Sequence, residues 1–289
     1  MTSPASFDVE VRLSALHVHP VKSCGGLAPD AARLVETGLE LDRAWMLVDA
    51  QGRFVTQRQV PRMALIQPTL TPTGLTLRAP GQPALAVPLA LGGAAVRVTV
   101  WHDEVAAFDL GDAAAQWCSD VIGQPLRLVR FDPAQRRLAS AQWTGEIEAP
   151  AAFSDEYPLL VISQASLTEL NRRLAAAGHA PVTMQRFRPN LVLDGLDAHD
   201  EDHLDEICFD TPEGPVRLRL VKPCARCSIP DVDPLTAATG HAVGDALAHY
   251  RADARLNGAL TFGMNAVIVD GVHCTLRTGM RGGATYRFD

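Results

Sequence analysis

Short runs of alternating apolar and polar residues are the feature that most limits how this chain folds. Residues 11–18 alternate in this way, and residues 44–48 and 53–57 flank the turn-like sequence Asp49-Ala50-Gln51-Gly52. Further strand-like runs span residues 96–100, 126–131, 191–193 and 216–221. Because side chains two positions apart lie on one face of a strand, these runs predict sheets with a buried face. We therefore expect a chain rich in β-structure.

Three segments carry helix signals. The first spans residues 112–122, with Asp112 as its expected N-cap and a glycine just beyond its end. The second begins at the expected capping box of Ser166 and Glu169, and leucines recur through it at helical spacing. The third, residues 243–250, is a weaker prediction because a glycine lies inside it. The sequence thus predicts few helices among many strands.

Two segments without strand or helix patterns suggest how the chain divides. Residues 68–93 are rich in proline and glycine and are predicted to be a surface loop with short strands. Residues 132–152 are polar with few apolar positions, which favours an interdomain linker. A length of 289 residues favours two domains. The predicted domains are residues 8–130 and residues 131–289.

Charge and hydropathy exclude several classes of protein. A net charge of −7 argues against a general nucleic-acid-binding protein, which would carry a basic excess. No apolar run approaches the roughly 18 residues that span a bilayer. The first residues lack the basic and apolar regions of a signal peptide, so the six cysteines are expected to be thiols in a reducing compartment. These features predict a soluble, cytoplasmic protein.

Two cysteines lie close together at the end of a strand-like run, in Lys222-Pro223-Cys224-Ala225-Arg226-Cys227. The two cations beside them favour the thiolate, which is the form that binds soft metals. Half of a zinc site is an alternative, although no second pair of cysteines or histidines completes four ligands. A thioredoxin-type pair needs a helix N-terminus, whereas Pro230 and Pro234 indicate a loop. Both cysteines are equally explained as small buried apolar residues.

Several motifs, in order along nearly the whole chain, resemble those of MOSC domain proteins such as the amidoxime-reducing components and their bacterial relatives. In the C-terminal half these are the cysteine motif with Val232-Asp233-Pro234, the run Phe187-Arg188-Pro189-Asn190-Leu191, and residues 157–171. In the N-terminal half, three motifs resemble the β-barrel domain that precedes MOSC. They are His19-Pro20-Val21-Lys22-Ser23-Cys24, residues 42–48, and Thr56-Gln57-Arg58-Gln59.

The resemblance implies a β-rich α/β fold with an N-terminal MOSC-type β-barrel domain and a C-terminal MOSC β-barrel domain with a few helices. It also implies a molybdenum cofactor, molybdopterin with its metal, in the cleft between the two domains. In the family, the second cysteine of the motif supplies the protein sulfur to molybdenum. Cys227 is therefore the expected metal ligand and catalytic residue, and the role of Cys224 stays open.

Polar residues inside the matched motifs are the expected contacts of the cofactor. Arginine binds a phosphate through two parallel hydrogen bonds, and lysine adds a point charge. Ser166 also stands at an expected helix N-terminus, where free amides bind anions. The expected contacts are Lys22, Ser23, Arg43, Ser163, Ser166, Arg188, Asn190 and Arg226. Taken singly, each residue is also explained as a surface charge, a helix cap or a turn residue.

The function implied by the resemblance is a molybdenum-dependent oxidoreductase that reduces N-hydroxylated compounds, namely hydroxylamines, amidoximes and N-hydroxylated bases. Because the sequence shows no four-cysteine cluster motif, an external electron donor of the ferredoxin, flavodoxin or cytochrome type is expected. The alternative is a non-catalytic carrier of the cofactor or of sulfur. The loop after the expected ligand departs from the family, which leaves the substrate and the role of Asp233 open; the departures are Pro230, Asp231, Leu235 and Ala237.

Overall fold

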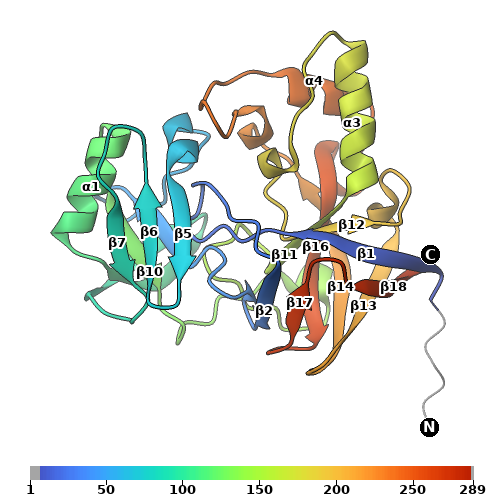
Figure 1. The fold of residues 1–289 in the computed structure, drawn as a ribbon, viewed down its shortest axis with the longest axis horizontal. Helices are drawn as coiled ribbons and strands as arrows, with labels where there is room; N and C mark the ends of the chain where they lie inside the picture. The colour runs from blue at the N-terminus through green and yellow to red at the C-terminus, as the bar shows by residue number, and fades with distance from the viewer. Residues whose placement is uncertain (1–6, 288–289) are drawn as a thin grey trace.

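A computed structural model describes residues 7–287, which form two lobes of β-structure joined side by side (Figure 1). One lobe is a closed seven-stranded barrel, and the other combines a four-stranded and a three-stranded sheet with one helix. The expected β-rich fold with few helices is therefore confirmed. Among the described residues, no helix combines the length and apolar character needed to cross a membrane.

The barrel draws its strands from both ends of the chain. They are β1 (Val9–Leu16), β11 (Leu159–Ser163), β12 (Leu191–Asp194), β13 (Leu204–Thr211), β14 (Gly214–Ala225), β16 (Ala259–Asp270) and β18 (Arg281–Tyr286). They pair in the order β11-β12-β1-β18-β13-β14-β16, and β16 pairs with β11 to close the barrel. The neighbours β11 and β12 are parallel. A two-stranded extension joins β16 to β15 (Ala252–Asp253).

Alternating side chains on the barrel strands separate an inner core from an outer one. On β11, Val161 belongs to the cluster that fills the barrel, whereas Leu160 and Ile162 belong to a cluster with two helices. These helices are α3 (Gln164–Ala176) and α4 (Ala242–Ala248), which lie together against one side of the barrel (Figure 1). The period-two pattern of the sequence thus positions both cores.

The first strands of the chain pair with strands from its C-terminal half. β1 lies between β12 and β18, and β2 (Ala31–Val35) pairs with β17 (Thr275–Arg277) as well as with β3 (Gly38–Leu39). The sheets therefore do not divide the chain at a single point. The boundary near residue 130 stays a prediction.

The second lobe is built around a four-stranded sheet in the order β4-β10-β9-β8. One face of β4 packs against the helix through Trp45 and Leu47, and the other face packs Met46 against Phe153. A three-stranded sheet in the order β5-β6-β7 completes the lobe. The elements are β4 (Trp45–Val48), β5 (Gln67–Thr71), β6 (Gly74–Arg78), β7 (Leu85–Pro88), β8 (Ala94–Val100), β9 (Asp103–Asp109), β10 (Arg127–Phe131) and α1 (Asp112–Ile122).

The two segments without clear patterns are more ordered than the sequence suggests. Residues 68–93 contain most of the β5-β6-β7 sheet, in which Leu75, Leu77 and Val87 are buried. Residues 132–152 contain α2 (Ala141–Thr144) and an isolated bridge between Leu138 and Pro150. Short 3₁₀ helices occur in the connections: η1 (Pro61–Leu65), η2 (Met184–Arg186), η3 (Asp200–Asp202), η4 (Ile229–Asp231) and η5 (Ala254–Leu256).

Two expected helix caps were wrong. Gly111 is the N-cap of α1, and Asp112 is its first helical residue. Ser163 is the N-cap of α3, because its backbone is extended and its hydroxyl accepts a hydrogen bond from the Ser166 amide at 3.0 Å. Glu169 forms no capping box and instead pairs with two arginines of the same helix. The third helix is confirmed as α4.

Candidate functional site

A cavity of about 120 Å³ lies beside the loop that follows β14, and we call it the cysteine cavity. Its wall combines residues 22–58 with residues from positions 154–265, so both halves of the chain contribute. Seven of the nine predicted site residues line it: Lys22, Ser23, Arg43, Arg188, Asn190, Arg226 and Cys227. Motifs that are far apart in the sequence therefore meet at one place.

The two cysteines of the motif differ in environment. Cys227 is exposed, in the loop between β14 and η4, whereas Cys224 is partly buried. Burial raises the pKa of the Cys224 thiol despite Arg226, which donates a hydrogen bond to its sulfur at 3.1 Å. Lys222 pairs with Glu156 at 2.5 Å. Arg226 thus favours the Cys224 thiolate as expected, but burial outweighs this effect and leaves the pKa of Cys224 raised.

Lys22 forms a buried cationic wall of the cysteine cavity. Its ammonium donates to the carbonyl oxygen of Phe153 at 2.7 Å and to the carboxylate of Asp155 at 2.5 Å. Burial lowers the pKa of Lys22, and Asp155 opposes that shift. The backbone at Lys22 is held because its amide donates to the carbonyl oxygen of Trp45, the first residue of β4. Lys22 thus couples the second lobe to the cavity.

Arg43 and Arg188 cross-link the segments on either side of the cavity. Arg43 donates to the carbonyl oxygen of Arg188 at 2.8 Å and forms an ion pair with the buried Asp42. Arg188 donates in turn to the carbonyl oxygen of Cys24. Burial, followed by the repulsion of Arg43, lowers the pKa of Arg188 to about 10, so its guanidinium stays charged at neutral pH.

Three residues of the cavity wall have left-handed backbone conformations. The φ angles are 64° at Ser23, 47° at Arg43 and 56° at Arg188. A residue with a Cβ in this region stores about 1–3 kcal/mol of strain, and such strain concentrates at functional sites. All three residues line the cysteine cavity. The backbone therefore supports the assignment of this cavity as the functional site.

Polar atoms without partners surround the cavity. Within the described residues, Nη2 of Arg188, Nε of Arg226 and the hydroxyls of Ser154 and Tyr157 are buried and make no hydrogen bond. Each such group costs free energy unless a ligand or water satisfies it. Five cations and two carboxylates line the cavity, although the chain as a whole is acidic. This set of groups fits a polar, anionic ligand.

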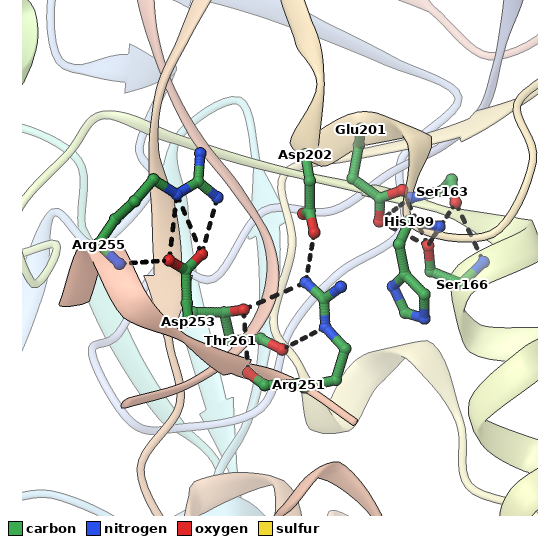
Figure 2. A network of polar contacts seen from close by, with 9 residues as sticks. All are labelled: Ser163, Ser166, His199, Glu201, Asp202, Arg251, Asp253, Arg255 and Thr261. Atoms are coloured by element: carbon green, nitrogen blue, oxygen red, sulfur yellow. Dashed lines mark hydrogen bonds and ion pairs between the residues drawn. The ribbon is translucent and has the colours of Figure 1, made fainter. Parts of the chain in front are cut away.

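Ser163 and Ser166 do not line the cysteine cavity. Both are fully buried, and their hydroxyl oxygens lie 2.7 Å apart at the start of α3 (Figure 2). The Ser166 hydroxyl donates to Glu201 at 2.7 Å, and the Ser163 amide donates to the same carboxylate at 3.1 Å. The His199 amide donates to the Ser166 hydroxyl oxygen at 2.8 Å. Both serines therefore hold the end of β11 and the start of α3 together.

Asn190 lines the cavity, but its amide group is already engaged. The side-chain oxygen accepts from the Leu160 amide at 3.1 Å, and the side-chain nitrogen donates to the His17 carbonyl oxygen at 3.3 Å. The side chain thus joins β1 to the starts of β11 and β12. These contacts give Asn190 a structural role. Its contact with a cofactor stays a prediction.

The loop after Cys227 is held by its own carboxylates. Asp233 accepts hydrogen bonds from the amides of Leu235 and Thr236, each at 2.9 Å, and pairs with Arg186 at 2.8 Å. Asp231 accepts from the Val243 amide at 2.8 Å at the start of α4. These contacts match the turn interpretation of Asp233. None of the four positions that depart from the family pattern lines the cysteine cavity.

Several lining residues were missed by the sequence reasoning. Arg58 lies within a matched motif but carried no assigned role, and Tyr157 begins another. Ser154 and Asp155 had no signal, since they lie between the predicted linker, residues 132–152, and the matched motif that begins at Tyr157. Asp155 is identified by its contacts with Lys22 and Trp101, which no spacing in the sequence reveals.

The described residues offer few protein ligands for a metal ion at this site. Within residues 7–287, no cluster of three or more histidine, cysteine, aspartate or glutamate side chains is arranged to hold a metal ion. The zinc alternative thus gains no support from the structure. A metal that brings most of its ligands on a cofactor needs only one protein thiolate.

Two family models match the chain: the MOSC N-terminal beta barrel domain over residues 10–125 and the MOSC domain over residues 148–279. The chain belongs to the MOSC family. Mitochondrial amidoxime-reducing component 1 of Homo sapiens is similar to this MOSC protein, with 36% identity over 234 residues, 78% of this chain and 67% of the relative. Mitochondrial amidoxime reducing component 2 of Bos taurus is 33% identical over 237 residues, with the same coverage of 78% and 67%.

A third relative differs in size. Molybdenum cofactor sulfurase of Homo sapiens is 28% identical over 254 residues, which cover 82% of this MOSC protein but 28% of the relative. The chain therefore spans about two thirds of the length of the amidoxime-reducing relatives and about a quarter of the sulfurase. The name of this third relative mentions the molybdenum cofactor.

Proposed function

We propose that this MOSC protein binds a molybdenum cofactor in the cysteine cavity and reduces N-hydroxylated compounds. The observation that carries the proposal is the arrangement of one exposed thiol, five cations and four unpartnered polar atoms around a single cavity. The names of the two amidoxime-reducing relatives support the reaction type. The chemistry of the lining fits the cofactor, because molybdopterin carries a phosphate and a polar pterin.

In this proposal different lining residues bind different parts of the cofactor. The thiolate of Cys227 is the metal ligand, since Cys224 is held as a thiol by burial. Lys22, Arg43 and Arg188 supply positive charge for the phosphate, with Ser23 beside them. The unpartnered Nε of Arg226 would donate a hydrogen bond to the polar pterin. The bound cofactor supplies the two-electron redox centre that removes the hydroxyl oxygen of the substrate.

The proposal keeps only those predicted cofactor contacts that line the cysteine cavity. Ser163 and Ser166 are left out, because their hydroxyls are engaged with Glu201 away from the cavity. Asn190 is kept as part of the wall. Electrons come from a separate ferredoxin, flavodoxin or cytochrome, and the substrates are hydroxylamines, amidoximes or N-hydroxylated bases. The cytoplasmic location stays a prediction.

Substitution of the two cysteines tests the ligand assignment. We expect Cys227→Ser to abolish stoichiometric molybdenum in the purified protein, because a hydroxyl is a poor ligand for a soft metal. Cys224→Ser should retain most of the molybdenum and serves as the matched control. Elemental analysis gives the metal content, and thermal unfolding confirms that both variants fold. Equal molybdenum in wild type and Cys227→Ser would contradict the assignment.

The reaction is tested with a reduced dye as electron donor. Protein with stoichiometric molybdenum should oxidise the dye when benzamidoxime or hydroxylamine is added, and Cys227→Ser should not. The carrier alternative has its own support, because one relative is named a molybdenum cofactor sulfurase. Stoichiometric molybdenum without reduction of any N-hydroxylated compound would favour the carrier function over the reductase.

A further inference from the structure

A larger hollow of about 690 Å³ opens beside the cysteine cavity and shares part of its wall. The two share Arg58, Asp155 and Cys227 among other residues, so the hollow leads directly to the exposed thiol. The outer part of the hollow is lined by residues that the cysteine cavity lacks, including Trp101 and Leu138. The hollow thus offers a small molecule one route from solvent to Cys227 along this outer wall.

Trp101 occupies an unusual position in this wall. It is 41% exposed, although large apolar side chains are commonly buried. It is the first residue of the two-residue loop between β8 and β9, and its φ angle is 56°. Glycine, asparagine or aspartate is preferred at such a position, because a bulky side chain there is strained. A tryptophan at this point of the turn exposes a flat ring at a cost in stability.

The ring of Trp101 is held rigidly by its neighbours. The indole nitrogen donates to the Asp155 carboxylate at 3.1 Å, and the same carboxylate pairs with Lys22. Phe54 packs against the indole with ring centroids 5.1 Å apart. The ring therefore has a fixed orientation relative to the wall of the cysteine cavity. An aromatic surface that is already ordered loses little entropy when a ligand stacks on it.

Arg58 extends this surface. Its guanidinium lies 4.6 Å from the centroid of the Trp101 ring, a distance typical of a cation–π contact. The side chain is exposed, and within the described part of the chain no carboxylate lies within ion-pair distance of it. Arg58 lines both the cysteine cavity and the outer hollow. Its planar group therefore offers both a stacking face and hydrogen-bond donors close to Cys227.

We propose that Trp101 and Arg58 form a stacking platform that favours planar, conjugated N-hydroxy compounds over small aliphatic ones. This inference rests on the proposed reductase function and names the substrate class of the same site. Conjugated amidoximes and N-hydroxylated bases have flat faces that stack on indole and guanidinium groups. Hydroxylamine has no such face. Trp101 is thus a specificity-determining residue that does not take part in the chemical step.

The kinetic test compares two substrates in protein of equal molybdenum content. With a reduced dye as donor, we expect Trp101→Ala to raise KM for benzamidoxime at least about tenfold more than KM for hydroxylamine, with kcat changed little. Trp101→Phe keeps an aromatic face but loses the hydrogen bond to Asp155, so it separates stacking from that bond. Leu91→Ala removes a similarly exposed apolar side chain outside the hollow and is the matched control.

A binding measurement keeps the platform testable if the reductase function fails. Calorimetric titration of the oxidised holoprotein with benzamidoxime should show at least about tenfold weaker binding to Trp101→Ala than to wild type. Such a loss without turnover of any substrate would overturn the reductase function and leave the platform standing. Turnover with equal KM changes for the two substrates would overturn the platform and leave the function standing. Undetectable binding to the wild type would also overturn the platform.

Discussion

At the scale of single residues, Arg188 combines features that favour a role in ligand binding. It has a left-handed backbone, a buried guanidinium and one nitrogen without a partner among the described residues. Its remaining contact, with the carbonyl oxygen of Cys24, ties the two sides of the cavity together. A charged group that is built into a wall and left partly unsatisfied is poised for an anion.

We expect Arg188→Ala to lower molybdenum content while the protein stays folded, because the lost charge faces the cavity. Arg186→Ala is the control, since Arg186 pairs with Asp233 and does not line the cysteine cavity. Elemental analysis and thermal unfolding of both variants measure the two effects. A large fall in melting temperature for Arg188→Ala that parallels the loss of metal would instead identify Arg188 as structural.

Sequence reasoning found residues inside recognisable motifs and missed those defined by contacts across the fold. Lys22, Arg43 and Cys227 were identified because they lie within ordered matches to a known family. Trp101 and Asp155 belong to the same wall but meet only when the hairpin of β8 and β9 folds over the cavity. The protonation state of Cys224 was misjudged, because burial outweighs the charges beside it in sequence.

At the scale of elements, the start of α3 is fixed by a buried carboxylate. Glu201 lies in η3 and is fully buried, and its hydrogen-bond donors are the Ser163 amide and the Ser166 hydroxyl (Figure 2). Burial raises the pKa of this carboxyl, and the two serine contacts oppose that shift. Both serines lie in a matched motif, which is why the sequence suggested a cofactor contact where the structure shows a helix junction.

The raised pKa of Glu201 predicts a pH-dependent stability. Between the ordinary glutamate value of 4.5 and the higher native pKa, the folded protein binds more protons at this site than the unfolded chain does. The contribution of Glu201 to the free energy of unfolding therefore falls as pH rises through that range. Glu201→Gln cannot ionise, so it should gain stability relative to wild type as pH increases from about 4.5.

Melting temperatures of wild type and Glu201→Gln between pH 4.5 and pH 8 measure this effect. Glu146→Gln, at an exposed position, is the control and should follow the wild-type curve. A constant difference between wild type and Glu201→Gln across the range would mean that the carboxyl keeps the same proton affinity in the folded and unfolded states.

At the scale of the whole molecule, the barrel depends on β1. This strand fills the gap between β12 and β18, so residues 131–287 alone would leave two strands with open edges. The start of β1 lies beside the end of β18, since the Asp8 amide donates to the carbonyl oxygen of Ala284 at 2.9 Å. A short linker from residue 287 to residue 8 could therefore connect them without changing the barrel.

We expect residues 131–287 to be unfolded or aggregated in isolation, because the barrel cannot close. The same residues followed by a short glycine-rich linker and residues 8–40 should fold, since β1, β2 and β3 are restored. Circular dichroism and cooperative thermal unfolding distinguish the two polypeptides. Cooperative unfolding of residues 131–287 by themselves would show that β1 is dispensable.

The β-rich character of both lobes was predictable, because it follows from local alternation of apolar residues. Which strands pair with one another was less predictable. Nothing in residues 11–18 indicates pairing with strands that are more than 170 residues away. Helix α3, which lies against the barrel, was identified through leucine spacing, but its N-cap was predicted at Ser166, whereas the structure places it at Ser163.

The position of β1 also has a consequence for synthesis of the protein in the cell. Among the strands of residues 7–287, β1 leaves the ribosome first, and its partners β12 and β18 emerge much later. Its apolar residues therefore stay exposed while the intervening lobe is translated, and the barrel closes only after β18 is released. Contacts of such long sequence separation fold slowly. We therefore expect chaperones that bind extended apolar segments to capture ribosome-bound chains through residues 9–16 as long as β18 has not been released.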